Sequence, residues 1–139
     1  MIIADTGFWL ALANRRDANH ARAQELLQGL DEALITTWPV LTETCHLLVA
    51  RLGVDAALTF MRSARAGAFE VFALASAHLA RIEALMAKYR NLPMDLADAS
   101  LVVLAEELGS GRIFSTDQRD FGAYRGKERK PFENLMRVR

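Results

Sequence analysis

The sequence predicts an α/β fold, a three-layer α/β/α sandwich with a central parallel sheet of four to five strands. Short apolar runs of four or five residues alternate with longer segments of helical periodicity. Such alternation is typical of a parallel sheet that is covered on both faces and connected by right-handed crossovers. The chain has 139 residues, 52% of them hydrophobic, which is enough for one buried core. We therefore expect a single domain over residues 1–139.

The first predicted elements are a strand and two helices. Residues 1–4 are apolar and stop at Asp5 and a turn, which predicts a short buried strand. Residues 8–14 follow as a short apolar helix. A second helix is expected over residues 17–30, capped by its first residue. Residues 33–36 are apolar again and predict the second strand.

The middle of the chain predicts two helices and a third strand. A helix is expected over residues 38–52, because Pro39 suits a first helical turn and Gly53 follows its end. The next helix covers residues 55–66. Residues 69–73 contain aromatic and β-branched side chains and are suited to a strand.

The last third predicts two long helices and the remaining strands. A helix is expected over residues 76–90, and a second one over residues 95–108, capped by its own first residue. Residues 112–115 form the fourth predicted strand. The polar stretch 116–120 after it is expected to be a turn, and residues 135–138 are expected to add an edge strand.

Charge is distributed unevenly along the chain. Seventeen basic residues balance 17 acidic ones, but the part from residue 119 onward holds seven basic and three acidic residues. Such a segment can bind an anionic polymer, although a charge cluster of this size is more often an ordinary solvated surface. The residues that would make this contact are Arg119, Arg125, Lys127, Arg129 and Lys130.

Several classes of protein are excluded by absent signals. The single cysteine, Cys45, cannot form an internal disulfide, and no run approaches the roughly 18 apolar residues of a membrane span. We therefore expect a cytoplasmic protein without membrane contact. No glycine-rich nucleotide loop and no His or Cys spacing of a zinc site is present, and His20 is expected to pack within a helix pair.

Four carboxylates lie at the ends or in the first turns of predicted elements. In a doubly wound sheet all four can point into one crevice beyond the carboxyl ends of the strands. Each also has a structural explanation: Asp95 and Asp98 have the spacing of a helix capping box, and an Asp after a strand often forms a turn. The four candidates are Asp5, Glu43, Asp98 and Asp117.

Clustering of these acids favours a metal site. Two carboxylates about 4 Å apart repel by about 4 kcal/mol at an effective dielectric constant of about 20. A divalent cation removes that repulsion, and ligation by oxygen alone suits Mg²⁺, with Mn²⁺ as a substitute, better than zinc. Such an ion would support cleavage of phosphodiester bonds.

With these residues in view, the chain resembles the PIN-domain family, and within it the VapC-type toxin ribonucleases of toxin–antitoxin modules. The resemblance runs over nearly the whole length. It is carried by five ordered segments: IIADTGFWLAL, DANHARAQELL, WPVLTETCHLL, PMDLADASLVVLAEE and IFSTDQRDFGAYR.

The resemblance implies a PIN-like sandwich, a Mg²⁺-dependent endoribonuclease for single-stranded RNA, a homodimer and inhibition by a cognate antitoxin protein. The family's catalytic and metal-binding acids correspond to Asp5, Glu43, Asp98 and Asp117. Its hydroxyl position corresponds to Ser115, where Thr is commoner. Supporting roles are expected for Thr6, Ser115 and Asp95.

Two alternatives remain at this point. A non-catalytic domain of the same fold would bind RNA or a protein partner without cutting, but the loss of one of the four acids would be the signal for it. A dehalogenase-like phosphatase also carries an Asp after its first strand. Its motif needs a second Asp two residues later, where this chain has Gly7.

Overall fold

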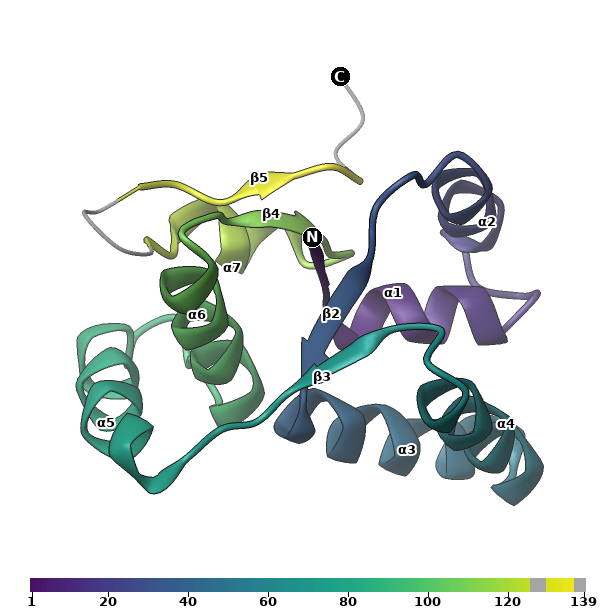
Figure 1. The fold of residues 1–139 in the computed structure, drawn as a ribbon, viewed down its shortest axis with the longest axis horizontal. Helices are drawn as coiled ribbons and strands as arrows, with labels where there is room; N and C mark the ends of the chain where they lie inside the picture. The colour runs from purple at the N-terminus through teal and green to yellow at the C-terminus, as the bar shows by residue number, and fades with distance from the viewer. Residues whose placement is uncertain (126–129, 137–139) are drawn as a thin grey trace.

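A five-stranded parallel sheet lies at the centre of the molecule, with strand order β3-β2-β1-β4-β5 (Figure 1). The computed structural model describes residues 1–125 and 130–136, and only the backbone of residues 118–120. The strands are β1 (Ile2–Ala4), β2 (Leu34–Thr37), β3 (Glu70–Phe72), β4 (Arg112–Phe114) and β5 (Glu133–Asn134).

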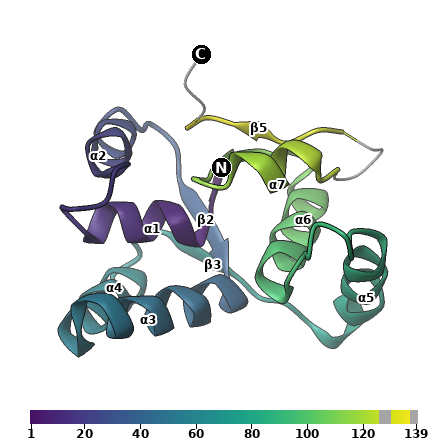
Figure 2. The same ribbon diagram turned by 180° about the vertical axis from the view of Figure 1, so that it is seen from behind.

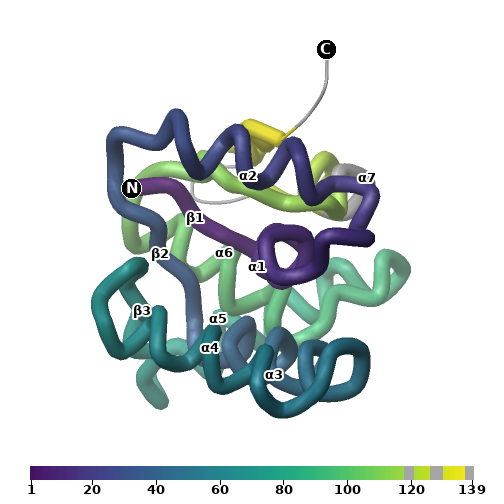
Figure 3. The backbone as a smooth tube through the Cα atoms, turned by 90° about the vertical axis from the view of Figure 1, so that its right-hand side faces the viewer, coloured from purple at the N-terminus to yellow at the C-terminus, as the bar shows by residue number. Residues whose placement is uncertain are grey.

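Helices cover both faces of the sheet, which confirms the predicted three-layer α/β class. Helices α1 to α4 lie on one side and α5 and α6 on the other, as Figures 1 and 2 show from front and back and Figure 3 from the side. The helices are α1 (Thr6–Ala13), α2 (His20–Gln28), α3 (Trp38–Leu52), α4 (Val54–Arg65), α5 (Leu79–Lys88), α6 (Leu96–Leu108) and α7 (Gln118–Ala123).

Strand β1 is the middle strand and is completely covered. Ile3 pairs with Ile35 of β2 on one side and with Ile113 of β4 on the other, and all three side chains are buried. Parallel strands buried on both faces are continuous apolar runs, as these are. Because the strands are parallel, their carboxyl ends meet at one edge of the sheet, and Asp5 lies at that edge.

Helix α6 crosses the sheet as an almost fully buried element. Every residue from Ala97 to Ala105 except Asp98 is buried. The helix ends at Gly109, whose φ of 68° is in the left-handed region that glycine adopts without strain. A helix buried on nearly all sides fixes the direction of the one carboxylate in its first turn.

The structure corrects four expected elements. The polar stretch after β4 is a turn only as far as Asp117, because α7 begins at Gln118. The edge strand is Glu133–Asn134 rather than residues 135–138, of which 137 and 138 lie outside the described residues. The helix expected over residues 76–90 divides into a 3₁₀ turn (Ser76–His78) and α5.

The fourth correction concerns the second helix, which starts at His20. Asp17 does not cap it, since its carboxylate accepts the backbone N–H of Asn19 in a local turn. His20 does pack within a helix pair, as expected, because its Nδ1 donates to the carbonyl of Ala11 in α1 at 2.7 Å.

Among the described residues, no helix is long and apolar enough to cross a membrane.

A buried hydroxyl pair ties the sheet to α6 beside the carboxyl edge. Thr37, the last residue of β2, donates to Ser100 Oγ at 2.6 Å, and Ser100 donates to the carbonyl of Ala97 at 2.7 Å. Both hydroxyl side chains are fully buried. Buried polar groups are retained in cores when such bonds satisfy them.

Removing the Ser100 hydroxyl is therefore expected to leave Thr37 with a buried, unsatisfied donor. We expect Ser100→Ala to lower the free energy of unfolding by about 1–3 kcal/mol, measured by urea denaturation. Thr42→Ala removes an exposed hydroxyl that donates to the carbonyl of Trp38, and it should cost less than about 0.5 kcal/mol. Equal losses for the two variants would contradict a stabilising role of the buried pair.

Candidate functional site

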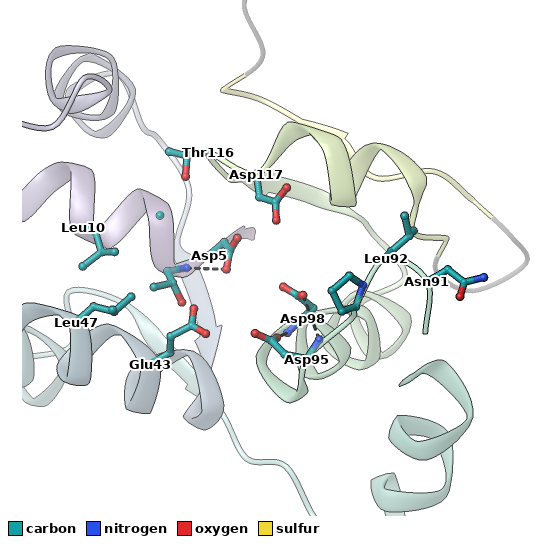
Figure 4. Close-up of a pocket in the computed structure, with 13 residues that line it drawn as sticks. Asp5, Leu10, Glu43, Leu47, Asn91, Leu92, Asp95, Asp98, Thr116 and Asp117 are labelled. Carbon is teal, nitrogen blue, oxygen red and sulfur yellow. Dashed lines mark hydrogen bonds between the residues drawn. The ribbon is translucent and has the colours of Figure 1, made fainter. Parts of the chain in front are cut away.

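A cleft of about 520 Å³ opens at the carboxyl edge of the sheet, between α1 and α3 on one side and the start of α6 on the other (Figure 4). All four predicted acids line it, and Asp95 is a fifth. The lining side chains are Asp5, Thr6, Gly7, Leu10, Glu43, Leu47, Asn91, Leu92, Pro93, Asp95, Asp98, Thr116 and Asp117.

Asp5 lies at the floor of the cleft and is only 7% exposed. It is the N-cap of α1: its Oδ1 accepts the backbone N–H of Thr6 at 2.7 Å, and its Oδ2 accepts the hydroxyl of Ser115 at 2.9 Å. Burial raises the pKa of Asp5 to about 6, although both hydrogen bonds act in the opposite direction. The negative charges of Glu43 and Asp117 raise it further.

Asp98 and Asp95 form a capping box at the start of α6. The Asp98 N–H donates to Asp95 Oδ1 at 2.8 Å, and the Asp95 N–H donates to Asp98 Oδ2 at 3.3 Å. The buried Tyr124 donates its hydroxyl to the same Oδ2 at 3.3 Å. Burial, then the charges of Asp95 and Asp5, raise the pKa of Asp98 to about 8. The capping explanation of Asp98 is thus correct, and the same carboxylate also faces the cleft.

The segment after β4 brings the last acid to the cleft. The Asp117 N–H donates to Ser115 Oγ at 2.9 Å, so the Ser115 hydroxyl connects the Asp117 backbone with the Asp5 carboxylate. Thr116 lies so close to Gly7 that a Cβ on Gly7 would overlap Thr116 Oγ1 and come 3.0 Å from its Cβ. Only glycine at position 7 lets this segment approach α1 without a shift.

Glu43 completes the group from the opposite wall. It lies in the second turn of α3, half-buried, and Figure 4 shows its carboxylate directed toward Asp5 and the cleft. Leu47, one turn later on the same face, forms the apolar wall beside it. The charge of Glu43 reaches Asp5 strongly enough to raise the pKa of that carboxyl.

The donor set fits a hard divalent cation. Five carboxylates line the cleft, and none of the described residues that line it is a Lys, Arg, His or Cys. The acids are nevertheless spread around the cleft: among the described side chains, no three His, Cys, Asp or Glu are close enough together to hold an ion as they stand. Oxygen donors that line an open cleft suit Mg²⁺ or Mn²⁺, which retain water ligands when bound.

Two residues of the predicted basic segment, Arg125 and Lys130, are described and are not among the residues that line the cleft. Arg125 donates from Nη1 to the carbonyls of Gly122 and Tyr124, both at 2.9 Å. Lys130 is exposed, the side chain of Arg119 is not described, and Lys127 and Arg129 lie outside the described residues. The structure therefore does not place this segment at the acids.

Sequence reasoning missed several residues of the cleft. The loop of Asn91, Leu92 and Pro93 forms one rim, although the sequence indicated only a helix break there. Tyr124 contacts Asp98 across 26 positions, and no local pattern signals such a contact. Gly7 had a signal, since glycine in the first turn of a helix is unfavourable and suggests a close approach.

Comparisons with known proteins agree with this fold and identify a family. The family model of the PIN domain matches residues 2–127. The chain is 32% identical over 124 residues to "Ribonuclease VapC26" of Mycobacterium tuberculosis, covering 89% of this chain and 92% of the relative. It is 43% identical over 58 residues to "23S rRNA-specific endonuclease VapC20" of the same organism, covering 42% of this chain and 44% of the relative.

A solved structure has the same fold. The crystal structure of M. tuberculosis VapC20, described as a sarcin-ricin loop cleaving toxin, superposes with a TM-score of 0.80 over 86% of this chain and 92% of that one, at 24% identity. The family model and the similarity to VapC26 along most of both chains lead to one assignment. The chain belongs to the PIN-domain family and, within it, to the VapC group.

Proposed function

We propose that this protein is a metal-dependent endoribonuclease that cleaves single-stranded RNA, with Asp5, Glu43, Asp98 and Asp117 as its catalytic and metal-binding residues. One observation carries the proposal: five carboxylates surround one cleft, and no basic residue is among the described residues that line it. Such a concentration of charge around a partly dry space is unfavourable unless the acids are protonated or a cation binds.

The four acids would hold Mg²⁺, or Mn²⁺ in its place. A bound divalent cation supplies an activated water and offsets negative charge on the phosphate oxygens. The Thr6 N–H and the Ser115 hydroxyl fix the two oxygens of Asp5 in direction, and the Tyr124 hydroxyl fixes one oxygen of Asp98. We therefore assign supporting roles to Thr6 and Ser115, which orient Asp5, and to Asp95, whose capping bond orients Asp98.

The shape of the cleft favours a flexible strand as substrate. Asp5 lies at its floor with 7% exposure, so a scissile phosphate has to enter between α1 and the rim formed by Asn91 and Pro93. A single strand can bend into such a space, whereas a regular duplex cannot. Contacts of the RNA phosphates with the basic segment that begins at Arg119 would add affinity that is independent of sequence.

The biological setting is proposed from the VapC relatives. We propose that the protein is the toxin of a type II toxin–antitoxin pair in the cytoplasm, that it acts as a homodimer and that a cognate antitoxin inhibits it. Exposed apolar side chains on α3 and α4, among them Leu52, Val54 and Leu58, support contact with a protein partner.

The first test concerns metal binding. Isothermal titration with Mn²⁺ should show a site that Asp5→Asn and Asp98→Asn each weaken by about tenfold or more, because each removes a charged oxygen ligand. Asp55→Asn makes the same change in the first turn of α4, away from the cleft, and should leave the affinity within about twofold. Unchanged affinity in both cleft variants would contradict the assignment of these ligands.

The second test uses the pH dependence of the metal-free protein. An acid whose pKa is higher in the folded chain than its ordinary 3.8 holds its proton more tightly when folded. The contribution of such an acid to the free energy of unfolding is therefore greatest below about pH 4. It is lost as the pH rises through about 6 for Asp5 and through about 8 for Asp98. The raised pKa of Asp5 corresponds to a loss of about 3 kcal/mol in the free energy of unfolding once this carboxyl is deprotonated.

We therefore expect the melting temperature in EDTA to fall by several degrees between pH 5 and pH 8.5, measured by differential scanning fluorimetry. Asp5→Asn should flatten the lower part of this curve and leave the metal-free fold as stable or more stable. Added Mn²⁺ should raise the melting temperature most at high pH. A melting temperature that rises over this range would contradict the raised pKa values, and a large loss for Asp98→Asn would show that helix capping dominates there.

The third test is the activity itself. Purified protein should cut single-stranded RNA internally with Mg²⁺ or Mn²⁺, and EDTA should stop the reaction. Asp5→Asn should lower the rate by about 100-fold or more, because water activation and charge stabilisation both depend on the ligand set. Cutting in EDTA would show a different mechanism or contamination. A metal-bound protein that cuts no RNA from a random pool would indicate the non-catalytic alternative.

A further inference from the structure

The edge strand β5 ends in a side chain that extends the sheet by one residue. The regular pairing of β4 with β5 stops at Ile113 and Asn134. Beyond it, the Asn134 carboxamide pairs with the backbone of Ser115: its Oδ1 accepts the Ser115 N–H at 3.2 Å, and its Nδ2 donates to the Ser115 carbonyl at 2.9 Å. The Asn134 carboxamide thus takes the place of a peptide group in the pairing with β4.

The carboxamide is itself held firmly. Asn134 Oδ1 also accepts the N–H of Met136 at 3.1 Å, and the Leu135 N–H between them donates to the carbonyl of Ile113 at 2.8 Å. Arg22 of α2 donates to the Leu135 carbonyl at 3.4 Å. The Asn134 side chain is therefore bonded to the Ser115 backbone after β4 and to the backbone that follows β5, and Arg22 of α2 holds the neighbouring Leu135.

Ser115 is the residue through which two acids of the cleft are connected. Its hydroxyl donates to Asp5 Oδ2 and accepts the Asp117 N–H, both at 2.9 Å. The position of that hydroxyl depends on the backbone of Ser115, and both polar groups of this backbone are bonded to Asn134. A carboxamide suits such a pairing because, like a peptide group, it carries a donor nitrogen and an acceptor oxygen on one planar, uncharged group.

We propose that Asn134 is a positioning residue for the cleft, which acts by fixing the Ser115 hydroxyl and through it Asp5 and Asp117. Asn134 does not line the cleft and lies beyond residues 2–127, which the family model matches. Its importance for catalysis rests on the proposed nuclease function, whereas its hold on the Ser115 segment does not.

The effect of Asn134 on the Ser115 segment can be tested by amide hydrogen exchange, followed by NMR, without metal or RNA. In Asn134→Ala, the Ser115 and Asp117 amides should exchange about tenfold faster or more, measured relative to the Ile3 amide of β1 in the same sample. Asn134→Asp keeps the acceptor and loses the donor, and should give a smaller increase. Glu133→Ala, an exposed neighbour on β5, is the matched control and should change neither amide. Exchange within twofold of the parent in Asn134→Ala would overturn the proposal.

A double-mutant cycle tests the route through the Ser115 hydroxyl. Asn134→Ala should lower kcat for RNA cleavage about tenfold with KM within twofold, since Asn134 acts on the acids and not on the RNA. In a Ser115→Ala background the same change should cost less than twofold. An equal cost in both backgrounds would overturn the route through Ser115. If the parent cuts no RNA, the proposed function fails, and the exchange measurement still decides the role of Asn134.

Discussion

Asp5 keeps a carboxylate almost entirely out of water at the end of the central strand, and three distant parts of the chain meet around it. Its own helix provides the Thr6 N–H, the end of β4 provides the Ser115 hydroxyl, and α6 brings Asp98 to the other side of the cleft. Two hydrogen bonds offset only part of the cost of burying a charge. The raised pKa of Asp5 reflects the part of that cost which the hydrogen bonds do not offset. A bound cation would offset it.

The acids of the cleft also stabilise the helices that carry them. Asp5 caps α1, and Asp95 and Asp98 cap α6, so the positive ends of two helix dipoles point toward the same space. These dipoles and N–H groups partly compensate the negative charges in the absence of metal. Capping and the proposed ligation are thus not competing explanations of Asp98, because the Asp95 N–H and the Tyr124 hydroxyl both bond to its Oδ2 and the carboxylate has a second oxygen, Oδ1.

The sequence was sufficient for the layers, for strands β1 to β4 and for the gathering of the four acids at one cleft, because each of these depends on a local pattern of apolar runs, caps and strand ends. The sequence was insufficient where a structure depends on contacts with residues far away along the chain. Helix α7 forms from a polar stretch that carries no apolar periodicity, and the edge strand lies two residues earlier than its apolar content indicated. Contacts such as Tyr124 with Asp98 join segments that only the tertiary fold brings together.

The strand order has a consequence for the order of assembly. Of the five strands, β1 is synthesised first and is the middle of the sheet, while its neighbour β4 and the edge strand β5 are synthesised last. A nascent chain that ends before residue 112 can pair β1 with β2 and β2 with β3, but it leaves Asp5 without the Ser115 hydroxyl and without Asp117. Contacts of such long sequence separation form late in folding. The acidic cleft is therefore complete only after β4 and residues 115–117 have been synthesised, and whatever chemistry it performs begins after that point.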